Sequence, residues 1–190
     1  MIGDLRSAPN QLTLLRLLIV PFIVIAVVDE RYRIAFLLFI AAGISDGLDG
    51  LLARMLGQRT VLGQYLDPIA DKLLLSTLFI TLSIVHRIHW RITILVFSRD
   101  IGILVISAVL YLTAGLRDFR PGLFGKLNTL AQIVAVLAVM VAEFYPRPIV
   151  LGIRQYGLYA TMTLTVASAV QYVILVDRRL KALQATPPAQ

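Results

Sequence analysis

Residues 46–71 read DGLDGLLARMLGQRTVLGQYLDPIAD and contain four of the eleven acidic residues of the chain. Long apolar runs lie on both sides of this stretch. A carboxylate at the centre of a bilayer costs roughly 2.5 to 3.5 kcal/mol, so four unpaired ones would cost on the order of 10 kcal/mol, comparable to the stability of a whole domain. We therefore expect the four aspartates to face a wet cavity, to bind cations, or both: Asp46, Asp49, Asp67 and Asp71.

The composition of the 190-residue chain indicates a helical membrane protein. Apolar residues make up 58% of the chain, charged residues make up 15%, and the mean hydropathy is +0.84. Soluble domains are about half apolar and about a quarter charged. A soluble helical core would also show polar faces at helical period, and runs such as 73–85 show none. We predict an all-α integral membrane protein with one domain.

The apolar residues fall into six runs of about 20, the length that crosses roughly 30 Å of hydrocarbon. They predict six transmembrane helices around a polar cavity that faces the cytoplasm, in residues 10–28, 34–54, 66–85, 92–113, 127–144 and 156–176. Pro146 and Pro148 are expected to break the chain before the last span. We expect a short N-terminal surface helix in residues 1–9, a six-span domain in 10–178, and a disordered cytoplasmic tail in 179–190. The N-terminus lacks the features of a signal peptide, so we expect the first span to be retained.

The basic residues predict the orientation in the membrane. The net charge of +7 fits contact with anionic headgroups or a phosphate-rich substrate better than it fits nucleic acid. Six spans put both termini on one side, and nine Lys and Arg lie on that side against six on the other. Because basic residues favour the cytoplasmic side, we predict a multi-pass protein of the cell (inner) membrane with both termini in the cytoplasm. The absence of cysteine excludes disulfides and thiolate metal sites.

The spacing of the four aspartates predicts a site for hard divalent cations. Asp46 and Asp49 are three residues apart, and Asp67 and Asp71 are four apart, so each pair lies on one face of a helix. The two helices are joined by a short turn, so we expect them to be antiparallel neighbours whose carboxylates converge. Oxygen ligands without His or Cys select Mg²⁺, Mn²⁺ or Ca²⁺. Four carboxylates suit two such ions, a recurrent device for phosphoryl chemistry.

Small residues accompany the aspartates at helical spacing. Gly50 is one turn from Asp46, and Ala53 is one turn from Asp49, which leaves that helical face free of bulk. Close helix packing through small residues would explain the glycine and alanine by itself. Packing does not require the aspartates, and a phosphorylated group would need both features. Arg54 would pair with a carboxylate or with phosphate.

Together these residues resemble the signature of the CDP-alcohol phosphotransferases, the class I CDP-alcohol phosphatidyltransferases. The pattern D-G-x-x-D-G-x-x-A-R, eight residues, G-x-x-x-D-x-x-x-D occurs here with every position matched. The segments PNQLTLLR, SRD and GKLNTLAQ also resemble the phosphatidylglycerophosphate synthase and eukaryotic-type cardiolipin synthase branch. The resemblance covers about residues 8–140, and the last span matches only in being apolar.

The resemblance implies transfer of the phosphatidyl group of CDP-diacylglycerol to an alcohol, with release of CMP, by a homodimer of six-span subunits. It implies two Mg²⁺ or Mn²⁺ ions held by Asp46, Asp49 and Asp67, with Asp71 as the general base and a further metal ligand. By matched position it also implies a nucleotide site made of Asp46, Gly50, Ala53, Arg54, Gly63 and Asp67.

Two charged positions outside the signature are candidates for other roles. Arg99 lies about two turns into the fourth span, where a buried cation is costly, and the adjacent Asp100 is expected to point away from it. We expect Arg99, with Lys126, to bind an anionic acceptor; pairing of Arg99 with the aspartate cluster is the alternative. Arg16 shares a helical face with other polar residues, which a snorkelling side chain would explain. His86 and His89 are expected at the membrane interface rather than as metal ligands, and Trp90 suits the same headgroup level.

Three classes of function compete. A phosphatidyltransferase is favoured, with sn-glycerol 3-phosphate as acceptor and phosphatidylglycerophosphate as product, and with cardiolipin synthesis from phosphatidylglycerol as the close alternative. A cation transporter would predict broken helices near the bilayer midplane and an inverted repeat, whereas the Gly and Pro residues cluster near span ends. A structural membrane protein would leave four converging aspartates unexplained.

Overall fold

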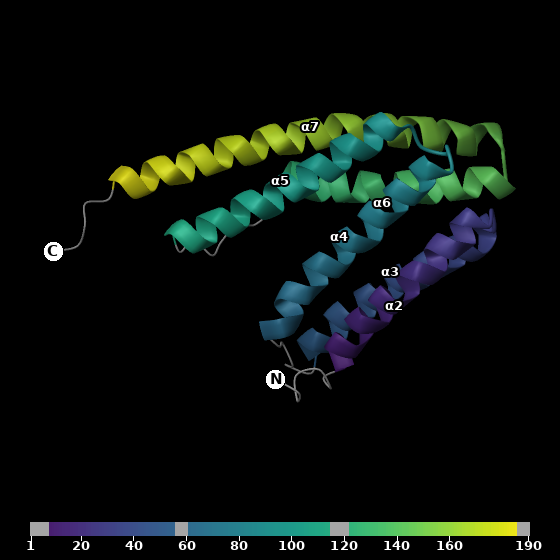
Figure 1. Ribbon diagram of the computed structural model, residues 1–190, viewed down its shortest axis with the longest axis horizontal. Helices are drawn as coiled ribbons and strands as arrows, with labels where there is room; N and C mark the ends of the chain where they lie inside the picture. Colours follow the sequence, from purple (N-terminus) through teal and green to yellow (C-terminus); the bar gives the residue numbers. More distant parts are fainter. Residues whose placement is uncertain (1–7, 56–60, 115–121, 186–190) are drawn as a thin grey trace.

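The computed structural model describes residues 8–55, 61–114 and 122–185, which form six helices and their connections (Figure 1). It describes the backbone alone for residues 8–13, 46–55, 61–69, 108, 110, 111, 113, 114, 179, 180 and 182–185. The all-helical fold with six helices is confirmed, whereas the surface helix expected in residues 1–9 falls outside the described residues, apart from the first two residues of α2. The helices are α2 (Ala8–Val28), α3 (Tyr32–Met55), α4 (Val61–Ile84), α5 (Trp90–Ala114), α6 (Leu123–Phe144) and α7 (Pro148–Ala185).

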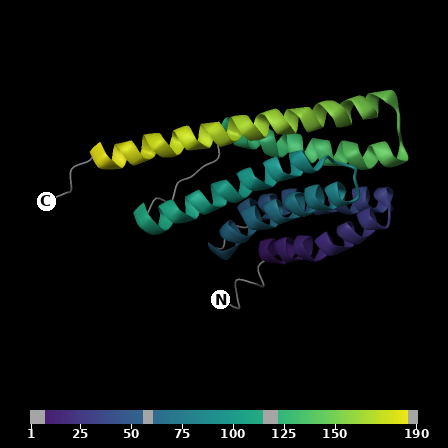
Figure 2. The same ribbon diagram turned by 45° about the horizontal axis from the view of Figure 1, so that its top comes forward.

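Three connections, residues 29–31, 85–89 and 145–147, lie at one end of the bundle, which we call the short-loop end (Figures 1 and 2). In two of them the second residue is in the left-handed region, Glu30 with a φ of 58° and His86 with a φ of 59°. After α4, Arg87 N donates to Leu82 O at 2.8 Å, and the equivalent bond after α2 has the same length. This is the Schellman arrangement, in which glycine usually takes the left-handed position. It ends each helix abruptly and reverses the chain.

The last helix begins earlier and ends later than the apolar run that predicted it. It starts at Pro148 rather than at residue 156 and extends to Ala185, into the predicted tail. The expectation that Pro148 breaks the chain is wrong, because proline is compatible with the first turn of a helix, where its missing N–H has no intrahelical partner. Near the other end, Lys181 pairs with Asp177 one turn back at 2.7 Å. Residues 179–185 therefore continue the helix.

The helices pack around one apolar core. α2 packs against α3 and α4, and α7 packs against α5 and α6, while α6 also contacts α3 and α4 and so joins the two groups (Figures 1 and 2). The completely or almost completely buried side chains of this core include Ile23, Val27, Leu78, Phe79, Leu82, Val136, Val139 and Met140.

The outer surface of the bundle is apolar. Within the described residues, the segments Leu123–Phe144 and Pro148–Arg178 are long and apolar enough to cross a membrane. Large apolar side chains also face outward from α2 and α3, where Leu18 and Leu37 are each 64% exposed. Soluble monomers rarely expose contiguous apolar patches beyond a few hundred Å². The outer surface is therefore suited to contact with lipid.

Candidate active site

The four signature aspartates lie on two consecutive helices. Asp46 and Asp49 lie near the C-terminal end of α3, and Asp67 and Asp71 lie in the first half of α4. α2 packs against both of these helices. Of these four aspartates, only Asp71 has a described side chain. The convergence of the four carboxylates therefore stays a prediction. The other predicted site residues of this stretch, whose side chains lie outside the described part, are Gly50, Ala53, Arg54 and Gly63.

Asp71 is held by an arginine from a helix that is distant in sequence. Arg16 Nη1 donates to Asp71 Oδ1 at 2.9 Å, across 55 residues of sequence. The Arg16 side chain is 1% exposed, whereas that of Asp71 is 48% exposed. Arg16 therefore does not snorkel to the interface, because it is buried in the bundle and paired. The contact thus anchors one oxygen of a carboxylate whose side chain is about half exposed.

A cavity of about 300 Å³ adjoins this pair. Arg16 and Asp71 supply its polar side chains together with Thr129 of α6. The remaining lining is apolar and comes from α3, α4 and α6: Phe39, Ile40, Ala42, Gly43, Ile44, Leu74, Leu75, Ile133 and Leu137. A group with a polar head at Asp71 and a hydrocarbon chain would match both parts of the lining.

Next to Asp71, Lys72 begins a buried charge network that consists of Lys72, Asp100, Arg99 and Ser168. Asp100 Oδ1 accepts a hydrogen bond from Lys72 Nζ at 2.9 Å and another from Arg99 Nη1 at 2.6 Å. Arg99 Nη2 also donates to Ser168 Oγ of α7. The side chains of Arg99 and Asp100 are 7% and 3% exposed. Two cations thus share one carboxylate inside the bundle.

The pairing of Arg99 with Asp100 corrects the expectation that these neighbours point apart. The spacing rule describes the directions of the Cβ atoms, and the arginine side chain is long enough to curl back to the next residue. Even so, Arg99 Nε and Asp100 Oδ2 are buried without a hydrogen-bond partner. Such groups are costly unless a ligand or water meets them. The network therefore has both a positive excess and unused polar atoms.

Lys126, the other predicted acceptor residue, lies in the first turn of α6 and is exposed. The described contacts of Arg99 are with Asp100 and Ser168, and Lys126 is not among them. The structure thus describes Arg99 and Lys126 on different helices without a contact that joins them.

Sequence analysis missed a set of buried polar residues between α6 and α7. Asn128 and Gln132 are fully buried, and Thr165 Oγ1 donates to Asn128 Oδ1 at 2.9 Å. Both amide atoms of Gln132 lack a hydrogen-bond partner. Thr165 and Ser168 are one turn apart on α7, so this set adjoins the buried charge network. The signal was available, because Asn128 and Gln132 stand four residues apart in an otherwise apolar run.

Carboxylate ligands, as predicted here, suit Mg²⁺ or Mn²⁺. Asp71 fits such a site in that its carboxylate is half exposed, adjoins a cavity and engages Arg16 through one oxygen. No group of three or more acidic or His residues close enough to hold a metal occurs among the described residues, which exclude the side chains of the other three aspartates. His86 and His89 lie in the connection after α4, at the short-loop end.

Comparison with known proteins gives consistent results. The family model described as CDP-alcohol phosphatidyltransferase matches residues 6–171. A probable phosphatidylglycerophosphate synthase from Mycobacterium tuberculosis (strain H37Rv) is 33% identical over 189 residues, covering 96% of this chain and 87% of that protein. A CDP-diacylglycerol–glycerol-3-phosphate 3-phosphatidyltransferase from Aquifex aeolicus is 34% identical over 143 residues, covering 73% and 78%. The human CMP-forming cardiolipin synthase is 32% identical over 160 residues, covering 73% and 52%.

Proposed function

The chain belongs to the CDP-alcohol phosphatidyltransferase family, and from that premise we propose that it transfers the phosphatidyl group of CDP-diacylglycerol to sn-glycerol 3-phosphate. The products are phosphatidylglycerophosphate and CMP. The enzyme is a membrane transferase of phospholipid biosynthesis. The observation that carries the proposal is the complete aspartate signature on α3 and α4, with Asp71 in a cavity whose lining is otherwise apolar except for Arg16 and Thr129.

The signature residues bind the metal ions and the nucleotide. Asp46, Asp49, Asp67 and Asp71 hold Mg²⁺ or Mn²⁺, two ions for four carboxylates. Bound metal would neutralise the charge that develops on the diphosphate. The nucleotide site consists of Asp46, Gly50, Ala53, Arg54, Gly63 and Asp67, in which the small residues admit the nucleotide and Arg54 binds phosphate oxygens.

Asp71 is the general base. Its carboxylate takes the proton of the acceptor hydroxyl, and the hydroxyl oxygen attacks the phosphorus that bears the diacylglycerol. A new P–O bond forms, and the bond from this phosphorus to the bridging oxygen breaks. CMP leaves with the bonding electron pair. Arg16 Nη1 donates to Asp71 Oδ1 at 2.9 Å, which orients the carboxylate for the proton transfer.

The buried charge network favours an anionic acceptor. Arg99 and Lys72 share the single carboxylate of Asp100, so the network has one positive charge in excess. A phosphate group is the natural partner for this charge, and Lys126 at the start of α6 would meet the same phosphate as the acceptor enters. The relatives named for glycerol-3-phosphate transfer favour that acceptor over phosphatidylglycerol.

The membrane arrangement is part of the proposal. All six helices span the bilayer, both termini lie in the cytoplasm, and the enzyme acts as a homodimer. The cavity beside Asp71 opens to apolar side chains of α3 and α6, so it accommodates part of an acyl chain of CDP-diacylglycerol. The diphosphate then lies at the cytoplasmic ends of α3 and α4.

The acceptor is tested by supplying the purified protein with CDP-diacylglycerol, Mg²⁺ and one alcohol at a time, and by identifying the lipid product by mass. We expect glycerol 3-phosphate to give phosphatidylglycerophosphate at a rate well above that with phosphatidylglycerol, inositol or serine. Cardiolipin as the main product would replace the proposed acceptor with phosphatidylglycerol. Metal-ion flux in proteoliposomes without nucleotide, together with no CMP release, would favour a cation transporter instead.

A further inference from the structure

The short-loop end carries an excess of positive charge. Three carboxylates, those of Asp29, Glu30 and Glu143, lie there with six arginines: Arg31, Arg33, Arg87, Arg91, Arg147 and Arg154. Basic residues favour the cytoplasmic side of membrane proteins, and this end is the one that the proposed orientation puts outside. Orientation therefore does not explain the arginines. A ligand on this face would explain them.

Aromatic side chains accompany these arginines. Each of the four arginine–ring contacts among the described residues lies at the short-loop end, with the guanidinium carbon 5.2 to 5.8 Å from the ring centroid. A ring attracts a guanidinium through its face, and a contact of this kind does not consume the N–H donors. The rings thus hold the arginines in place without using their N–H donors, which suit phosphate oxygens. Arg87 is the exception, because it also donates to Tyr32 and pairs with Glu30 and Glu143. The contacts are Arg33–Phe144, Arg87–Tyr32, Arg91–Trp90 and Arg147–Tyr145.

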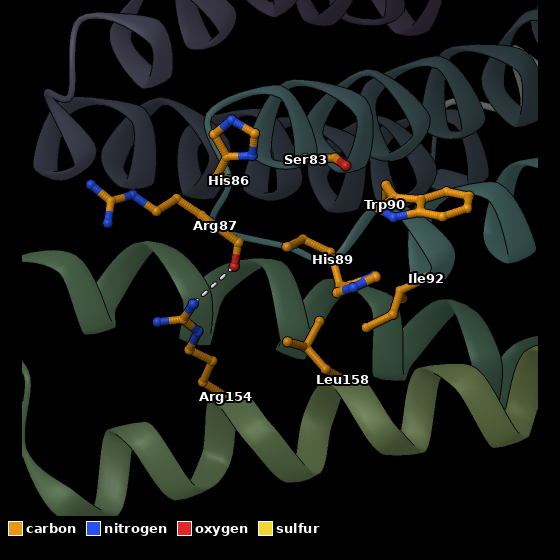
Figure 3. Close-up of a pocket in the computed structure, with 9 residues that line it drawn as sticks. Ser83, His86, Arg87, His89, Trp90, Ile92, Arg154 and Leu158 are labelled. Atoms are coloured by element: carbon orange, nitrogen blue, oxygen red, sulfur yellow. Dashed lines mark hydrogen bonds between the residues drawn. The ribbon is translucent and has the colours of Figure 1, made fainter.

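A cavity of about 530 Å³ lies at the same end, between the connection 85–89 and α7. Figure 3 shows Arg154 and Leu158 of α7 pointing toward the connection, and His89 and Ile92 pointing toward α7. Arg154 Nη2 donates to the backbone carbonyl of Arg87 at 2.9 Å. The cavity thus has guanidinium groups at one side and apolar side chains at the other, as a lipid with a charged headgroup requires.

Glu143 provides the counter-charge for both arginines of the cavity. Its carboxylate lies 3.1 Å from Arg87 Nη1 and 3.7 Å from Arg154 Nη1. Arg87 Nη2 also lies 3.5 Å from a carboxylate oxygen of Glu30, so two carboxylates serve the two guanidinium groups. The longer contact with Glu143 leaves Arg154 the more available. The hydrogen bond that Arg87 donates to the Tyr32 hydroxyl raises the pKa of that guanidinium, so Arg87 stays charged.

We propose that this cavity binds the phosphate headgroup of an anionic phospholipid, with Arg154 as the main phosphate donor and the acyl chains along Leu158 and Ile92. Arg91, stacked on Trp90 at its rim, adds attraction for the anionic surface. The site is separate from the aspartate signature, and it does not depend on the transfer reaction.

The test uses Trp90, the single tryptophan of the chain, which lines the cavity and is 57% exposed. The full-length protein is reconstituted in phosphatidylcholine vesicles that contain a small fraction of brominated phosphatidylglycerol or, in parallel, brominated phosphatidylcholine. Bromine quenches tryptophan fluorescence on contact. Each basic residue near an anionic lipid raises its local occupancy about fivefold. We expect quenching by phosphatidylglycerol to exceed quenching by phosphatidylcholine by about that factor in the wild-type protein.

Matched variants separate the cavity from general attraction to the membrane. Arg154→Gln lowers the preference for phosphatidylglycerol to the part that Arg91 contributes, whereas Arg154→Lys retains the charge and most of the preference. Arg178→Gln removes the same charge from an exposed position far along α7 and leaves the preference unchanged. Unchanged quenching by brominated phosphatidylcholine shows that each variant is inserted.

Three results would overturn the proposal. The first is equal quenching by the two lipids in the wild-type protein. This result does not require that the Arg154→Gln variant inserts into the bilayer. The second is a preference that is undiminished in Arg154→Gln, because the cavity would then not be its source. The third is loss of the preference on adding inorganic phosphate at constant ionic strength, which would assign the cavity to free phosphate.

Discussion

At the short-loop end, Arg87 is 34% exposed and contacts Tyr32, Glu30 and Glu143, whereas Arg16 and Arg99 in the interior are 1% and 7% exposed. The charges of the two regions thus lie in different surroundings. Exposed ion pairs contribute about 0 to 1 kcal/mol, because water screens them. A buried charge that loses its partner costs about 3 to 5 kcal/mol. Interior charges are therefore retained only where a specific arrangement or a reaction requires them.

The largest expected effect is at Asp71, one of the interior charges. Asp71→Asn keeps the shape of the side chain and removes the base, and general-base catalysis contributes about 10² to 10⁴-fold. We expect turnover to fall by about 10³-fold while CDP-diacylglycerol still binds. The measurements are CMP release and equilibrium binding of the lipid nucleotide. Full activity in this variant would remove Asp71 as the base.

The next effect concerns Arg16, which orients Asp71 from α2. Arg16→Gln removes the charge-assisted bond, and we expect kcat to fall by about 10 to 100-fold with a smaller change in the KM for CDP-diacylglycerol, because misplaced groups cost about this much. Arg16→Lys should recover part of the loss. A control with Asp71→Asn already present should show little further decrease. Additive losses in the double variant would show that Arg16 does not act through Asp71.

A smaller effect is expected at Arg99, which would bind the phosphate of the acceptor. Arg99→Gln should raise the KM for glycerol 3-phosphate by about tenfold, the loss of one charged hydrogen bond, and should change the KM for CDP-diacylglycerol much less. Ser168→Ala, which removes only the serine contact, is the matched control and should have the milder effect. An equal rise in both KM values would indicate that the buried charge network only supports the fold.

The smallest effect is expected at the short-loop end. Arg87→Gln removes contacts to two glutamates and a tyrosine, and we expect it to lower the free energy of unfolding by about 1 kcal/mol while kcat per folded molecule stays within about twofold. Lys181→Gln, at an exposed ion pair on α7, should change the free energy of unfolding by less than about 0.5 kcal/mol. Thermal unfolding in one detergent measures both. A tenfold loss of kcat in Arg87→Gln would contradict the expectation that the charges of the short-loop end do not serve the reaction.

The helices could be predicted from the sequence because an apolar run of sufficient length specifies a helix without reference to the rest of the chain. Their ends were harder. Pro148 is compatible with both a break and a first turn, and only packing decides between them. Glu30 and His86 take the left-handed position that sequence rules assign to glycine. Local spacing alone does not reveal such choices.

Part of the candidate site could likewise be predicted from the sequence, and part could not. The aspartate signature is a local pattern, and sequence analysis found it complete. The contact of Arg16 with Asp71 joins residues 55 positions apart, and no local rule predicts it. The pairing of Arg99 with Asp100 was wrongly excluded, because the rule for adjacent residues treats side chains as short and straight. Side-chain length and tertiary packing determined both contacts.

The most direct test of the central claim is CMP release from CDP-diacylglycerol by the purified protein with glycerol 3-phosphate, before and after removal of divalent metal. We expect CMP and phosphatidylglycerophosphate in equal amounts, loss of both with a chelator, and recovery with Mg²⁺ or Mn²⁺. CMP release that is absent with every alcohol acceptor in the presence of metal would contradict the account.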